Sequence, residues 1–146
     1  MRFVLNIIAP VLFSIVLPGT SLAEGWASLP DLRGIWIGKA DFMLDDGVTR
    51  QLHRFEFTHQ DGVFLKGHHS WSIPDENLKS HDGEQDAYEA TEKLLGVIGN
   101  DGTIHVVEHG DTTHFEMRLL NPYTIDFIAT EGGEHPLVGH GVLVRE

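Results

Sequence analysis

The chain has 146 residues, with 10 Lys and Arg against 22 Asp and Glu, which gives a formal net charge of −12 with neutral His. Such an acidic surface repels nucleic acid and anionic lipid, and it favours cations or basic partners. There is no Cys, which excludes thiolate metal sites and disulfide bonds, so stability has to come from a hydrophobic core.

The first 23 residues have the pattern of a secretory signal peptide. Arg2 gives a short positive start, residues 3–17 are mostly apolar, and small residues at 21–23 precede a cleavage site. Cleavage after Ala23 leaves 123 residues, enough for a single domain over 24–146. It also removes one Arg and no acid, so the formal charge becomes −13. We therefore expect a periplasmic or secreted protein without a membrane anchor in the mature chain.

The rest of the sequence predicts an all-β domain. Hydrophobic residues alternate with period two, and turn residues recur about every eight to twelve positions. We predict strands at 34–43, 49–59, 63–73, 91–98, 103–109, 112–120, 123–130 and 137–144. Most connections are short, and closing the sheet removes both edges, so an eight-stranded antiparallel up-and-down β-barrel is favoured over a two-sheet β-sandwich. The polar segment 74–90 is long enough to be a functional loop.

The first predicted strand begins with Gly34-Ile35-Trp36. This motif resembles the G-x-W opening of lipocalins and avidin-like proteins, the calycin group of small β-barrels. The resemblance implies that Trp36 plugs the closed end of the barrel and that an Arg, either Arg145 or Arg33, packs over it. The chain differs from lipocalins in placing the long loop after the third strand, and no set of biotin-binding residues can be matched.

Hairpin register decides which residues face the interior, because a slip of one residue exchanges the two faces. A three-residue turn at 60–62 pairs His53 with His69 and Phe55 with Gly67, and it separates polar from apolar positions. A two-residue turn at 61–62 leaves large apolar groups on both faces. We therefore predict the first register, with both His inside.

The same reasoning applies to the remaining hairpins. Across Gly110-Asp111, the pattern pairs Val106 with Phe115 and Glu108 with Thr113. A three-residue turn around Asn121 then predicts an inward set on the next strand, namely Tyr123, Ile125, Phe127 and Ala129. On the last strand, His140 and Val144 are expected to face inward.

These registers predict an apolar closed end and a half-polar open end. The open end, beneath the 74–90 loop, is a reasonable ligand site because buried polar groups need partners. The predicted ligand-binding residues are His53, Phe55, His69, Trp71, Glu108, Phe115, Phe127 and His140.

The leading functional hypothesis is an exported lipocalin-like protein that holds a small amphipathic ligand in the barrel. One alternative is an inhibitor of a basic hydrolase or protease, favoured by the negative charge. Another is a divalent-metal site, because imidazole and carboxylate suit Zn²⁺ or Cu²⁺; its candidate ligands are His53, His69, Glu108 and His140. No nucleophile or phosphate-binding motif is present, so we predict no catalytic residues, although acid–base chemistry by a His–Glu pair stays open.

Overall fold

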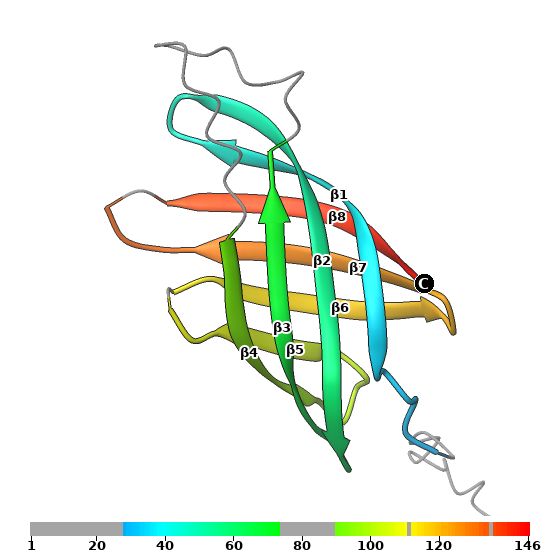
Figure 1. Ribbon diagram of the computed structural model, residues 1–146. Helices are drawn as coiled ribbons and strands as arrows, with labels where there is room; N and C mark the ends of the chain where they lie inside the picture. The colour runs from blue at the N-terminus through cyan, green and yellow to red at the C-terminus, as the bar shows by residue number, and fades with distance from the viewer. Residues whose placement is uncertain (1–27, 74–89, 111, 135) are drawn as a thin grey trace, which may run out of the picture.

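The computed structural model describes residues 28–73, 90–110, 112–134 and 136–146, which form a closed barrel of eight antiparallel strands (Figure 1). The predicted barrel is confirmed, and the sandwich alternative is wrong. The strands are β1 (Gly34–Leu44), β2 (Gly47–Asp61), β3 (Phe64–Ser72), β4 (Ala90–Ile98), β5 (Ile104–Glu108), β6 (His114–Asn121), β7 (Thr124–Glu131) and β8 (Leu137–Arg145).

Every strand pairs with its neighbour in sequence, and β1 closes the barrel against β8. In Figure 1, β2 and β3 pass in front of β6 and β7, which run across them. The predicted signal peptide and residues 74–89 of the predicted loop lie outside the described residues. Within the described part of the chain, no helix is long and apolar enough to span a membrane.

The core is built from alternate residues of the strands, whose side chains point into the barrel. On β7, for example, Ile125, Phe127 and Ala129 are fully buried, whereas Ile128 between them is 49% exposed. This period of two is the direct consequence of strand geometry, in which successive side chains point to opposite faces. The same alternation also buries polar residues, among them His53, His69 and Glu108.

The β2–β3 register differs from the predicted one. Phe55 lies opposite His69 rather than Gly67, and His53 lies opposite Trp71 rather than His69. The predicted pairing is therefore wrong by two residues. Because the shift is even, both His still face the interior.

A tight turn and a bulge together cause this shift. Asp61 pairs with Phe64, so the turn is two residues long, and Gly62 in it has a φ of 55°, a conformation that favours glycine. The register then changes between Phe57 and His59, where β2 has one more residue than β3. Turn and bulge together produce the separation of faces that the sequence pattern alone attributes to a three-residue turn.

The β5–β6 hairpin has the predicted register. Val106 lies opposite Phe115, and the Glu108 N–H donates to the Thr113 carbonyl at 3.3 Å. In the next hairpin Asn121 pairs with Thr124, which makes another two-residue turn. Tyr123 sits in that turn and is 66% exposed, so its predicted inward position is wrong.

The faces of β8 are opposite to the predicted ones. His140 and Val144 are exposed, whereas Gly139, Gly141 and Leu143 are buried. The outward valines of this strand therefore contribute to the barrel surface and not to its core.

The interior explains the glycines of β8. A Cβ on Gly139 would lie 2.4 Å from the Phe42 ring, and one on Gly141 would lie 2.6 Å from the Ala40 Cβ and 2.7 Å from the Phe127 ring. These distances are too short for non-bonded carbon atoms. Phe42 and Phe127 fill the space that side chains of β8 would otherwise occupy.

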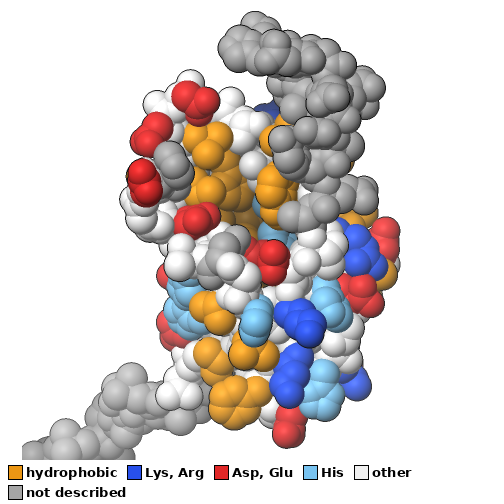
Figure 2. Space-filling view, turned by 60° about the vertical axis from the view of Figure 1, so that its left-hand side comes forward, with side chains coloured by type: hydrophobic (Ala, Val, Ile, Leu, Met, Phe, Trp, Pro, Cys, Tyr) orange, Lys and Arg blue, Asp and Glu red, His pale blue; other side chains and the backbone are white. Residues whose placement is uncertain are grey.

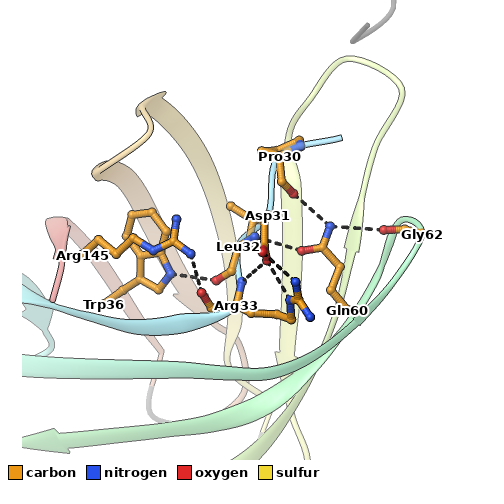
Figure 3. A network of polar contacts seen from close by, with 8 residues as sticks. All are labelled: Pro30, Asp31, Leu32, Arg33, Trp36, Gln60, Gly62 and Arg145. Atoms are coloured by element: carbon orange, nitrogen blue, oxygen red, sulfur yellow. Dashed lines mark hydrogen bonds and ion pairs between the residues drawn. The ribbon is translucent and has the colours of Figure 1, made fainter. Parts of the chain in front are cut away.

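The closed end of the barrel is built around Trp36, which is fully buried (Figure 3). Its indole N–H donates to the Leu32 carbonyl at 2.9 Å. The Arg145 guanidinium carbon lies 5.1 Å from the indole centroid, a cation–π contact, and Arg145 also donates to the Arg33 carbonyl. Arg145, rather than Arg33, thus covers the tryptophan.

Gln60 ties the entering chain to the β2–β3 turn at this end (Figure 3). Its side-chain oxygen accepts from the Leu32 N–H at 2.9 Å. Its side-chain NH₂ donates to the Pro30 carbonyl at 2.9 Å and to the Gly62 carbonyl at 3.3 Å. One amide group therefore joins three backbone positions.

Candidate functional site

The opposite end of the barrel holds a cavity of about 540 Å³. Figure 2 shows hydrophobic side chains inside a hollow on this part of the molecule, with acidic side chains along part of its edge. The described residues that line the cavity come from β1–β3, from β5–β8 and from the segments next to these strands: Phe42, Leu44, Asp46, Gly47, Val48, Thr49, Gln51, His53, His69, Trp71, Ile73, Glu108, Thr113, Phe115, Glu131 and Leu137.

Three buried polar side chains form a hydrogen-bonded chain at the cavity. His53 on β2, His69 on β3 and Glu108 on β5 are 4%, 2% and 8% exposed. His53 Nδ1 lies 2.8 Å from His69 Nε2, and His69 Nδ1 contacts Glu108 Oε1. We refer to these residues as the His–His–Glu chain.

The geometry of this chain restricts its protons. A carboxylate only accepts hydrogen bonds, so the His69 Nδ1–H donates to Glu108 Oε1. One proton then lies between the two rings. Burial, and secondarily the nearby His69, lowers the pKa of His53 from 6.5 to about 3. His53 is therefore neutral at ordinary pH.

Aromatic rings hold both imidazoles in place. Phe42 stacks on His53 with centroids 5.1 Å apart, and Phe55 stacks on His69 at 4.1 Å. The edge of Phe115 meets His69 at 5.0 Å. This packing leaves the imidazoles little freedom to turn, which preorganises them for a ligand.

One polar atom of the chain lacks a partner in the part of the protein that the structure describes. His53 Nε2 is buried there without a hydrogen bond. A buried nitrogen in this state costs about 1–3 kcal/mol. Native structures rarely tolerate such an atom without a role, and a bound molecule or an ordered water would satisfy it.

The predicted site residues separate into three groups. His53, His69, Trp71, Glu108 and Phe115 line the cavity. Phe55 and Phe127 are fully buried and pack against the imidazoles instead. His140 lies outside the barrel, with its Nε2 2.8 Å from Asp126 Oδ1, so its predicted place in the site is not supported.

The donors predicted for Zn²⁺ or Cu²⁺ do not converge on one point. The His69 nitrogens face His53 and Glu108, and His140 is on the outer surface. Among the described residues, no three His, Asp or Glu side chains are grouped so as to hold a metal ion. The arrangement favours hydrogen bonding within the His–His–Glu chain over a metal centre.

Several lining residues were missing from the predicted site. They lie at the strand ends and in the turns around the opening: Leu44, Asp46, Val48, Thr49, Gln51, Ile73, Glu131 and Leu137. The period of two, extended to the ends of β1, β2 and β7, would have found some of them. Turn residues such as Asp46 carry no such signal, because their side-chain directions depend on turn geometry.

No family model matches the sequence, and no curated protein matches it. The fold is similar to that of the S-type phycobiliprotein lyase CPES from Guillardia theta, with a TM-score of 0.53 and 9% identity over 79% of this chain and 88% of that one. It is also similar to EF1p2_mFAP2b bound to DFHBI, with a TM-score of 0.56 and 11% identity over 79% and 94%.

A redesigned β-barrel, mFAP0, bound to DFHBI, also matches, with a TM-score of 0.51 and 17% identity over 78% of this chain and 98% of that one. These neighbours are eight-stranded barrels of the lipocalin-like, calycin type. Identities this low show a shared fold and do not extend to function. The chain has a lipocalin-like β-barrel fold, and no sequence family is shown for it.

Proposed function

We propose that the protein binds a small amphipathic molecule in the open end of its barrel. The observation that carries this proposal is His53, a residue that lines a cavity of about 540 Å³ and whose Nε2 is buried without a hydrogen-bond partner among the described residues. A cavity of this size lies within the range that holds small molecules. Two barrels of similar fold, EF1p2_mFAP2b and mFAP0, are bound to DFHBI.

The cavity offers both kinds of contact that an amphipathic molecule needs. Its apolar walls include Phe42, Trp71 and Phe115, together with aliphatic residues near the opening. The His–His–Glu chain supplies the polar contacts. We therefore place the apolar body of the ligand against the rings and its polar group toward this chain.

The test uses N-phenyl-1-naphthylamine, an uncharged probe whose fluorescence rises in apolar surroundings. Gln51→Trp puts a large ring into the cavity lining and is expected to weaken probe binding at least about tenfold. Met43→Trp is the matched control, because Met43 is 60% exposed and does not belong to the described lining of this cavity. Circular dichroism checks that both variants fold. Equal binding by both variants, or no binding by the unmodified protein, would refute the proposal.

We also propose that the protein acts outside the cytoplasm, on the basis of the signal-peptide pattern alone. Intact-mass measurement of protein recovered from a bacterial periplasm should give a chain that begins at Glu24. An intact Met1 on recovered protein would contradict export by this route. The inhibitor hypothesis has only the net charge in its favour and stays a prediction.

A further inference from the structure

We infer that the cavity selects an amphipathic amine and rejects the corresponding carboxylate. This inference rests on the proposed function, because it names the chemical class of the ligand for the same cavity. It comes from the charges on the cavity wall, the hydrogen-bonding state of His53 and the aromatic rings nearby.

The described lining residues carry negative charge and no Lys or Arg. Asp46, Glu108 and Glu131 line the cavity, from the β1–β2 turn, β5 and β7. In Figure 2 acidic side chains lie along one side of the hollow and below it, and most of the Lys and Arg side chains in view lie lower on the molecule. The local field around a bound head group is therefore negative, in the same sense as the net charge of −12.

Two of these carboxylates lie on one stretch of wall. The Glu108 N–H donates to the Thr113 carbonyl at 3.3 Å, and the Thr113 hydroxyl donates to Glu131 Oε2 at 3.2 Å. We call Glu108, Thr113 and Glu131 the acidic wall. Removal of water by a ligand strengthens the field of such a wall, because the local dielectric constant falls.

His53 does not offset this charge, because burial lowers its pKa and keeps it neutral. Glu92, the strand partner of His69 on β4, adds a further carboxylate to this region. A cationic ligand thus gains electrostatic energy on entering, and an anionic one loses it.

The hydrogen-bonding requirement points the same way. His53 is 4% exposed, and its Nε2 has no partner among the described residues. In the arrangement in which His69 donates through Nδ1 to Glu108 and accepts at Nε2, the proton between the rings belongs to His53 Nδ1, and His53 Nε2 is an acceptor. An ammonium group brings three donors, whereas a carboxylate brings none. The rings of Trp71 and Phe115 on the cavity wall also suit a cation.

The test compares three fluorescent probes that share one apolar body. Dansylcadaverine ends in an ammonium group, N-pentyl dansylamide ends in a methyl group, and dansyl-6-aminohexanoate ends in a carboxylate. At low salt the amine should bind at least about tenfold more tightly than the neutral probe, and the carboxylate should bind most weakly. The margin between amine and neutral probe should shrink at about 1 M salt, where charges are screened within about 3 Å.

Glu131→Gln should reduce the ratio of the amine affinity to the neutral-probe affinity several-fold. Glu116→Gln is the matched control, because it removes the same charge from an exposed position on the outer face of β6. Equal effects of the two variants, or a carboxylate probe that binds as tightly as the amine, would overturn the inference. If the neutral probe binds no better to the unmodified protein than to Gln51→Trp, the proposed function fails instead.

Discussion

The two ends of the barrel differ in whether their inner polar side-chain atoms have hydrogen-bond partners. At the closed end, the Trp36 N–H and the Gln60 amide group both have backbone partners at hydrogen-bonding distance. At the open end, His53 Nε2 has none among the described residues. Satisfied groups stabilise a fold, whereas an unsatisfied one costs stability until a partner arrives. We infer that the closed end maintains the barrel and that the open end is built for an added molecule.

Replacing one tryptophan at each end by alanine should show most strongly that the closed end serves stability and the open end serves binding. Trp36→Ala empties a fully buried position and is expected to lower the free energy of unfolding by about 3–5 kcal/mol. Trp71 is only half-buried and lines the cavity, so Trp71→Ala should cost less than half as much and should weaken probe binding. Urea denaturation followed by circular dichroism gives both free energies. Equal losses at the two ends would contradict the division.

The open end should also make stability depend on pH. The pKa of His53 is about 3 in the folded protein and 6.5 in the unfolded chain, so only the unfolded chain takes up this proton between these values. The stabilisation is complete above pH 6.5 and is lost as pH falls toward 3, by up to about 1.4 kcal/mol per pH unit.

His53→Gln removes this titrating group and provides the control. Urea denaturation at a series of pH values between about 4.5 and 6.5 should show a shallower slope for the variant than for the unmodified protein. The two slopes should differ by an amount that corresponds to the uptake of nearly one proton on unfolding. Parallel slopes would mean that His53 is already protonated in the folded state.

Arg145, which lies over Trp36 at the closed end, should contribute less to the free energy of unfolding than Trp36 does. Arg145→Met keeps an apolar stem over Trp36 but loses the cation–π contact and the hydrogen bond to Arg33. A loss of about 1 kcal/mol is expected, with probe binding unchanged. Arg118→Met, at an exposed position on β6, should have almost no effect on thermal stability. Weaker probe binding in Arg145→Met would show that the two ends are coupled.

The smallest effect is expected at His140, which lies outside both ends. Its side chain is 65% exposed and pairs with Asp126, and exposed pairs of this kind contribute about 0–1 kcal/mol. His140→Ala should therefore change neither the unfolding midpoint nor the dissociation constant of N-phenyl-1-naphthylamine. A clear loss of binding would return His140 to the ligand site.

Much of the fold follows from local pattern. The period of two finds all eight strands and brings His53, His69 and Glu108 inside. It does so even where the predicted pairing is wrong, because the two-residue shift of β2 against β3 preserves the faces. The bulge between residues 57 and 59 has no clear signature in sequence, since Thr58 is an ordinary strand residue.

The faces of β8 show what local pattern leaves out. By hydrophobicity alone, Val144 is a better core residue than Gly141, and yet it is exposed. The deciding factor is the volume already taken by Phe42 and Phe127, which come from distant strands. The predicted site was incomplete for a related reason, because Asp46 and Glu131 reach the cavity only once the hairpins are folded.

The contact between Arg145 and Arg33 spans 112 residues of sequence, and it has a consequence for folding kinetics. The pairing of β1 with β8 forms only after a very long loop closes, which is entropically costly. The other strand pairs join neighbours in sequence, so the closure of β1 against β8 is expected to be the slowest of the pairing steps. Before β8 pairs with β1, the β1 edge is unpaired and Trp36 lacks the Arg145 side chain over its ring, and unpaired strand edges of this kind promote aggregation.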